Sequence, residues 1–126
     1  MESNLKDFIR VYDNVLDLNV CNNAIKLFEE NEEAQDRWEQ SHKPQFTQMN
    51  VTLLAEKDGN KAWGVIQNEL IKSIQSTSEL YMRDTACSPF WPPKNSIEQI
   101  RMKKYTAETE DRFDIHIDVG LSLIHI

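Results

Sequence analysis

The sequence predicts a single α+β domain in which helices come first and strands follow. Two segments, residues 20–28 and 61–82, repeat apolar side chains every three or four positions, which is typical of helices buried on one side. Two later segments, residues 97–105 and 113–119, alternate between apolar and polar side chains, as half-buried strands do. A chain of 126 residues is long enough for one domain with one modest core.

The first third of the chain predicts a short strand and then a helix. Residues 8–12 (FIRVY) are rich in β-branched and aromatic side chains, and a turn-forming Asp-Asn pair ends this strand. Asp17 or Asn19 can cap the helix, because a short side-chain oxygen accepts hydrogen bonds from the N–H groups of the first turn. The apolar stripe of the helix comprises Val20, Ala24, Leu27 and Phe28. Residues 29–40 are acidic and polar, so we expect a loop or a frayed helix end there.

The middle of the chain predicts a strand, a turn and the longest helix. Residues 46–54 (FTQMNVTLL) have the β-branched content and partial alternation of a strand, and Asp58-Gly59 is a turn signal. The helix over residues 61–82 has an apolar stripe of Trp63, Ile66, Leu70, Ile71 and Ile74. Three of the four prolines then fall in residues 88–93 (SPFWPP), which predicts a rigid surface loop.

Composition excludes several classes of function. The chain carries 14 Lys and Arg against 21 Asp and Glu, a net charge of −7, and no basic run, so nucleic-acid binding is not expected. No apolar stretch approaches the length of a membrane span, and the N-terminus lacks the apolar segment of a secretory signal. The two cysteines, Cys21 and Cys87, are far apart and predict free thiols. We therefore expect a cytoplasmic protein without membrane or nucleic-acid partners.

The last predicted strand could bind a metal ion. Residues two apart on a strand point to the same side, so the imidazole of His116 and the carboxylate of Asp118 can reach one cation. This pair of ligands suits Fe(II), Mn(II) or Zn(II). The same residues also fit a surface strand whose polar side is solvated, and the spacing alone leaves both interpretations open.

Two stretches, residues 99–105 (QIRMKKY) and 112–120 (RFDIHIDVG), resemble the 2-oxoglutarate and Fe(II)-dependent oxygenases. The resemblance is closest to the prolyl 4-hydroxylase-like branch, and looser to versions from marine phage and bacterial genomes. In that family a strand ends in a tyrosine, a turn follows, and an aromatic residue stands three places before the His of His-x-Asp. Those positions are occupied here by Tyr105, Phe113, His116 and Asp118. The specific match covers residues 97–120, whereas residues 1–96 agree with the family only in architecture.

The resemblance implies a double-stranded β-helix (a jelly roll) with supporting helices before it, incomplete in this chain. It implies His116 and Asp118 as two iron ligands and Tyr105 as a hydrogen-bond donor to the 2-oxoglutarate carboxylate. The implied cofactors are Fe(II) and 2-oxoglutarate, with ascorbate as reductant. The implied reaction hydroxylates an unactivated C–H bond of a peptidyl substrate, such as a prolyl residue, or of a small molecule. The family's turn usually holds glycines, where this chain has residues 106–111 (TAETED).

The family also needs a second histidine ligand and a basic residue for 2-oxoglutarate, both well downstream of Asp118. Residues 121–126 (LSLIHI) instead match the translation of a transposon end that is used in making sequencing libraries. We therefore expect residues 1–120 to be the N-terminal part of a single oxygenase domain and residues 121–126 to be a non-native tail. Such a fragment is expected to be inactive by itself.

Two other classes of function stay open from the sequence. One is a hydrolase that binds Zn(II) or Mn(II) through His116 and Asp118. The other is a non-catalytic acidic interaction domain in which both side chains are merely solvated.

Overall fold

The computed structural model describes residues 4–40, 44–59 and 61–117. Its helices and strands, in chain order, are α1 (Leu18–Glu30), β1 (Asp36–Glu39), β2 (Gln45–Asn50), α2 (Val51–Lys57), α3 (Ala62–Thr85) and β3 (Arg101–Lys104). Over the described residues, this mixture of helices and antiparallel strands confirms the predicted α+β class. The predicted order of elements is wrong, because β1 and β2 stand between α1 and α2.

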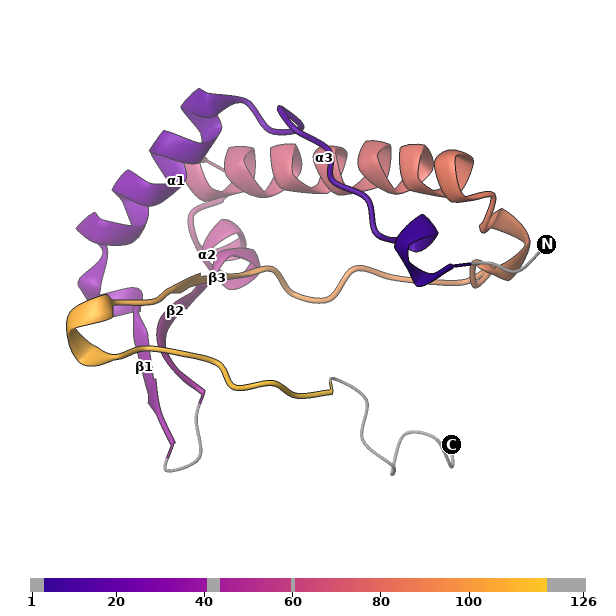
Figure 1. The fold of residues 1–126 in the computed structure, drawn as a ribbon. Helices are drawn as coiled ribbons and strands as arrows, with labels where there is room; N and C mark the ends of the chain where they lie inside the picture. Colours follow the sequence, from indigo (N-terminus) through magenta and orange to yellow (C-terminus); the bar gives the residue numbers. More distant parts are fainter. Residues whose placement is uncertain (1–3, 41–43, 60, 118–126) are drawn as a thin grey trace.

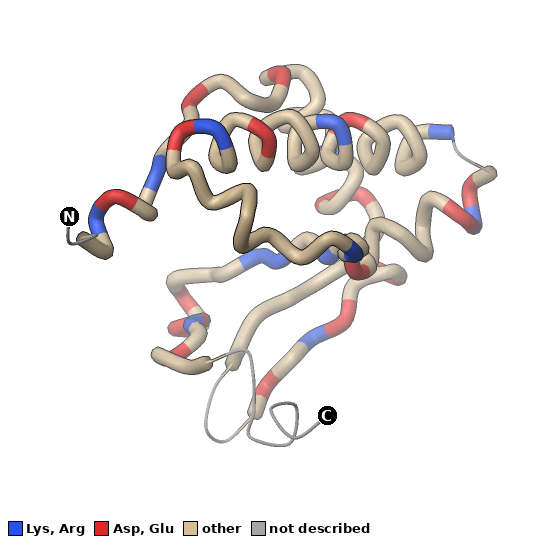
Figure 2. Tube along the Cα trace, turned by 90° about the vertical axis from the view of Figure 1, so that its right-hand side faces the viewer, with Lys and Arg blue, Asp and Glu red and all other residues tan. Residues whose placement is uncertain are grey.

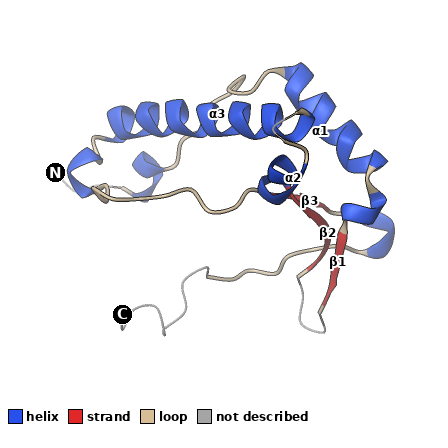
Figure 3. Cartoon of the chain, turned by 180° about the vertical axis from the view of Figure 1, so that it is seen from behind, coloured by secondary structure: helices blue, strands red, loops and turns tan. Residues whose placement is uncertain are grey.

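The three strands form one antiparallel sheet in the order β1-β2-β3, with β2 in the centre (Figure 3). In the register, Trp38 lies opposite Phe46, and Met49 lies opposite Met102. Because successive side chains of a strand point to opposite faces, Phe46 and Met49 belong to different faces of the sheet. Met49 belongs to the main core, whereas Phe46 is buried outside it. The two faces of the sheet are therefore covered by different groups.

The main core lies between the Met49 face of the sheet and the helices. Figure 1 shows α2 between the strands and α3. The buried residues of this core are Phe28, Met49, Val51, Ala55, Trp63 and Ile66. They come from α1, β2, α2 and α3, so these four elements are packed together. The predicted apolar stripes are confirmed at the positions of α1 and α3 that enter this core.

Side-chain oxygens determine where α1 and α2 begin. At the start of α1, Asp17 Oδ1 accepts a hydrogen bond from the N–H of Asn19 at 2.7 Å, so Asp17 is the cap of the two residues that the sequence offered. Asn50 caps α2 in the same way, accepting from the N–H of Leu53 at 3.0 Å. This second cap explains why the strand predicted over residues 46–54 is only partly right. The strand ends at the capping asparagine, and a helix follows it directly.

The long helix α3 confirms the prediction for residues 61–82 and continues to Thr85. The predicted turn before it is also present, because Gly59 has a φ of +67°, in the left-handed region that favours glycine. The carboxylate of Asp58 accepts hydrogen bonds from the N–H of Lys61 at 3.1 Å and of Trp63 at 2.8 Å. The turn and the first turn of α3 are thus joined by one side chain.

Two predictions for the first third of the chain are wrong. Residues 5–8 form a 3-10 turn, and residues 9–12 pair with no strand among the described residues. This segment instead runs beside α3 (Figure 1), where the hydroxyl of Tyr81 donates a 2.8 Å hydrogen bond to the carbonyl of Phe8. Residues 29–40, predicted as a loop or a frayed helix end, begin with the end of α1 but also contain β1, whose four residues are all exposed.

The strand predicted over residues 113–119 is wrong for residues 113–117, which form no strand. One antiparallel bridge joins Arg112 to Gln45. The next antiparallel pair would join Phe113 to residue 44, which precedes β2 and is not part of a strand. The rest of the predicted strand, from Asp118 onward, lies outside the described residues.

The strand predicted over residues 97–105 is present as the shorter β3, and the proline-containing segment after α3 is an exposed loop, as predicted.

Lys and Arg are interspersed with Asp and Glu over the described chain (Figure 2). α3 has enough residues to cross a bilayer, but it contains charged residues such as Glu69, Lys72 and Arg83. Within the described ranges, no helix is both long and apolar enough for a membrane span.

Candidate functional site

The face of the sheet that points away from the main core carries a cluster of aromatic rings. We call this group the aromatic cluster; it consists of Trp38, Phe46, Tyr105 and Phe113. Phe46 stands at its centre, and its exposed fraction is only 2%. The other three rings are 39% to 46% exposed, so they cover Phe46 and border on solvent.

Three ring contacts connect the cluster. The Phe46 ring is stacked with that of Trp38 at a centroid distance of 5.8 Å and with that of Phe113 at 6.1 Å. It also meets the Tyr105 ring at 5.6 Å, tilted by 51°. Offset and tilted pairs at these distances are the favourable arrangements of aromatic side chains. The contacts bring together β1, β2, the residue after β3 and the segment that returns to the sheet.

Lys103 of β3 lies over this cluster. Its ammonium nitrogen is 4.6 Å from the centroid of Phe46 and 5.3 Å from that of Phe113. Both distances are within the range of a cation–π interaction. The register places Lys103 opposite Gln48 and places Arg101 opposite Asn50, on the same face of the sheet. This face therefore combines aromatic surface with positive charge.

His116 extends the cluster. Its ring stacks on that of Phe113 with a centroid distance of 3.9 Å and an angle of 26°. His116 Nδ1 lies 2.7 Å from the backbone carbonyl oxygen of Asp114. When the proton is on Nδ1, that nitrogen donates to the carbonyl, and the lone pair is on Nε2. Histidine ligands of metals are commonly oriented by a hydrogen bond of this kind.

The two predicted metal ligands, the imidazole of His116 and the carboxylate of Asp118, are chemically suited to a ferrous ion, and the structure describes the first of them. An imidazole and a carboxylate are ligands that Fe(II) accepts. Asp118 lies outside the described residues. The carboxylate of Asp114, two residues before His116, forms an ion pair with Arg112 at 3.1 Å. Within the described part of the chain, no three His, Cys, Asp or Glu residues form a group that could hold a metal.

A turn between β3 and Arg112 brings the chain back to this face, and the carboxylate of Asp111 is its centre. Arg37 donates to this carboxylate through Nη2 at 2.7 Å and through Nη1 at 2.9 Å. The N–H of Thr106 and the hydroxyl of Thr109 donate to it at 2.9 and 2.8 Å. The Asp111 side chain has no solvent-exposed surface. These donors, first of all Arg37, hold the pKa of the Asp111 carboxyl well below its ordinary value.

Arg37, Phe46 and Asp111 were not among the site residues that the sequence predicted. Arg37 and Asp111 are 74 positions apart, and nothing in their local sequence connects them. In the sequence, Phe46 is one apolar residue of a predicted strand, and nothing near it indicates whether its face of the sheet is covered by the helices. Only the turn-forming character of an aspartate in a polar segment could have suggested Asp111.

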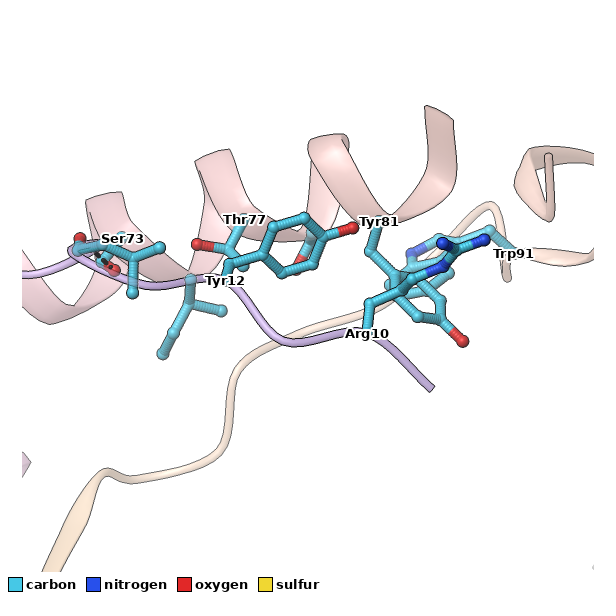
Figure 4. Close-up of a pocket in the computed structure, with 9 residues that line it drawn as sticks. Arg10, Tyr12, Ser73, Thr77, Tyr81 and Trp91 are labelled. Atoms are coloured by element: carbon cyan, nitrogen blue, oxygen red, sulfur yellow. Dashed lines mark hydrogen bonds between the residues drawn. The ribbon is translucent and has the colours of Figure 1, made fainter. Parts of the chain in front are cut away.

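A separate hollow lies between the N-terminal segment and α3 (Figure 4). Its volume is about 420 Å³, and its lining includes Arg10, Tyr12, Tyr81 and Trp91. The Tyr12 hydroxyl donates to the carboxylate of Asp84 at 2.9 Å. Burial, and next this hydrogen bond, raise the pKa of Tyr12 above its ordinary value. None of the residues that line this hollow belongs to the aromatic cluster.

Comparisons with known proteins add no assignment for this chain. No family model matches it, and neither the curated proteins nor the solved structures include a significant match.

Proposed function

We propose that this chain is part of a 2-oxoglutarate- and Fe(II)-dependent dioxygenase of the prolyl 4-hydroxylase-like kind. One observation carries the proposal: on one face of the sheet, Tyr105 and Phe113 both contact the ring of Phe46, and His116 stacks on Phe113. These three residues are those of the oxygenase-like pattern that the structure describes. In the proposal, the three-stranded sheet belongs to a larger jelly roll, and its aromatic face is turned toward the interior.

The proposal gives each of these residues a role. Nε2 of His116 and the carboxylate of Asp118 hold the iron, and Phe113 supports the imidazole by stacking. The Tyr105 hydroxyl donates a hydrogen bond to a carboxylate of 2-oxoglutarate, and Lys103 adds positive charge on the same face. The bound iron and 2-oxoglutarate supply the oxidising chemistry, in which 2-oxoglutarate and O2 give succinate and CO2 while a substrate C–H bond becomes C–OH.

The substrate class in the proposal is a peptidyl side chain such as proline, or a small molecule with an unactivated C–H bond. Ascorbate serves as the reductant. The second histidine ligand and the basic residue that pairs with 2-oxoglutarate belong, in this proposal, to sequence beyond Gly120. Residues 1–120 are then the N-terminal part of one catalytic domain.

The decisive experiment uses the protein encoded by the genomic reading frame extended beyond Gly120. Succinate released from 2-oxoglutarate is measured in the presence of Fe(II) and ascorbate. We expect release by the unchanged protein and at least a 100-fold loss in His116→Ala, because a metal ligand is removed. His42→Ala, which changes a histidine outside the pattern, is the matched control and is expected to retain activity.

The same protein separates the two alternative functions. Bound metal that is lost in His116→Ala, without any succinate release, would favour a Zn(II) or Mn(II) hydrolase. Metal content that does not change in His116→Ala would favour a non-catalytic interaction domain. Either result would contradict the oxygenase proposal.

Tyr105→Phe tests the role of the hydroxyl by itself. The ring contact with Phe46 is retained, so the fold is expected to be unchanged. Loss of one hydrogen bond to a charged group is expected to raise the KM for 2-oxoglutarate by about tenfold. An unchanged KM would remove Tyr105 from the cofactor site.

A further inference from the structure

The turn that leads to His116 contains a backbone conformation that is unfavourable for its residue. Glu110 has a φ of +55°, in the left-handed region that glycine adopts easily and other residues adopt at a cost. Glycines are usual in this turn of the oxygenases that the chain resembles. Here the turn over residues 106–111 has none, so other interactions must stabilise its conformation.

Asp111 supplies those interactions. Its carboxylate accepts from Thr106 and Thr109 inside the turn, and its own N–H donates to the carbonyl of Thr106 at 3.1 Å. Arg37 connects the same carboxylate to β1 through two parallel hydrogen bonds, a geometry that fixes both partners. Gln45 of β2 donates from Nε2 to the carbonyl of Thr109 at 2.8 Å. The turn is thus attached to both neighbouring strands.

This attachment determines the positions of the residues that come after Asp111. Arg112 exchanges two backbone hydrogen bonds with Gln45, at 2.9 and 3.1 Å. Phe113 is the next residue, and its ring stacks on Phe46. His116 in turn stacks on Phe113. Residues 113–117 form no strand, so regular pairing with the sheet does not place His116.

We propose that Asp111 is the positioning residue of this site: its carboxylate closes the turn and thereby sets Phe113 and His116 against the sheet. It touches neither the metal nor a substrate and acts only through the chain that follows it. The effect of Asp111 on metal binding rests on the proposed function, whereas its effect on the positions of the Phe113 and His116 rings does not.

The test uses NMR of the full 126-residue chain with Asp111→Asn. The side chain keeps its size but loses the charge that pairs with Arg37. We expect the nuclear Overhauser contacts between the Phe113 and Phe46 rings to disappear. The ring-current shift that Phe113 imposes on the His116 ring protons should also fall toward zero. If both signals persist in Asp111→Asn, the proposal is wrong.

Glu29→Gln is the matched control. Glu29 accepts a 2.6 Å hydrogen bond from Lys104, so this variant also removes a carboxylate that is paired with a basic residue of the sheet. That pair connects α1 to β3 and does not involve the turn. We expect the Phe113–Phe46 contacts and the His116 shift to remain. Their loss in this control would also contradict the proposal, since any charge removal near the sheet would then suffice.

The Trp38–Phe46 contact reports whether the rest of the sheet is intact. If Asp111→Asn loses this contact as well, the milder Thr109→Ala decides the question, because it removes only one donor to the carboxylate. In Thr109→Ala, the His116 shift should move part of the way toward that of an unstacked histidine. No movement would contradict the proposal.

Mn(II) added to the same samples distinguishes this inference from the proposed function. In the unchanged chain, Mn(II) should broaden the His116 signals selectively. The Mn(II) concentration for half-maximal broadening should rise about tenfold in Asp111→Asn, as is usual when a ligand loses its orienting contacts. Absence of selective broadening in the unchanged chain would contradict metal binding by His116 within these 126 residues, while the ring contacts would still decide the role of Asp111.

Discussion

At the scale of single residues, the carboxylate of Asp111 connects the turn of the candidate site to β1. It accepts hydrogen bonds from Arg37, Thr106 and Thr109, and its pKa is strongly lowered as a result. A carboxyl whose pKa is lower in the folded than in the unfolded protein stabilises the fold at pH values above its pKa in the unfolded protein. For an ordinary aspartate that pKa is 3.8, and the stabilisation declines as the pH falls below it.

Asp111→Asn should therefore be less stable than the unchanged chain at pH 7, and the difference should shrink by pH 3. The measurement is the free energy of unfolding in urea at pH 7, 5 and 3. A difference that stays constant over this range would show that the carboxylate does not stabilise the fold through its charge.

At the scale of elements, caps and turns decide the boundaries more than apolar patterns do. The sequence predicted α1 and α3 well, because each has both an apolar stripe and a recognisable start. It failed over residues 46–54, where β-branched residues suggested a continuing strand but Asn50 caps a helix. It also missed β1, whose three charged residues and one tryptophan depend on their pairing with β2. The local sequence of β1 does not indicate that it pairs with β2.

The start of α3 gives a prediction of its own. Asp58→Ala removes the acceptor for the N–H groups of Lys61 and Trp63. The expected loss is about 1 kcal/mol of unfolding free energy, the usual effect of removing a helix-capping side chain. Chemical denaturation of the variant measures it.

Glu56→Ala is a suitable comparison for this variant, because it removes an exposed carboxylate of α2 close to the same turn. Its unfolding free energy should change by less than about 0.5 kcal/mol. Equal losses in the two variants would argue against the capping role of Asp58.

At the scale of the whole molecule, one sheet separates two apolar regions of different kinds. On one side, Met49 and Phe28 are buried beneath the helices. On the other side, Phe46 is buried among neighbouring rings and beneath Lys103. Strand alternation already places Phe46 and Met49 on opposite faces of the sheet, but it does not indicate which face the helices cover, because both side chains are large and apolar.

Two core variants should distinguish these regions. Phe28→Ala and Phe46→Ala each remove a ring that is 2% exposed, and each should cost about 3–5 kcal/mol. Only Phe46→Ala should also abolish the ring-current shift of His116, because Phe28 lies on the other side of the sheet. Urea unfolding and NMR of both variants check this. A lost His116 shift in folded Phe28→Ala would contradict the separation of the two regions.

The N-terminal segment along α3 has a further consequence. None of residues 4–17 is buried, and polar contacts such as those from Tyr12 to Asp84 and from Ser73 to Val15 attach it to the helix. Such a segment detaches without disturbing the core. Brief trypsin digestion should therefore cleave after Arg10 while α3 is still intact, and the shortened product should keep its cooperative melting. A first cut within α3 would mean that the helix opens more readily than the segment beside it.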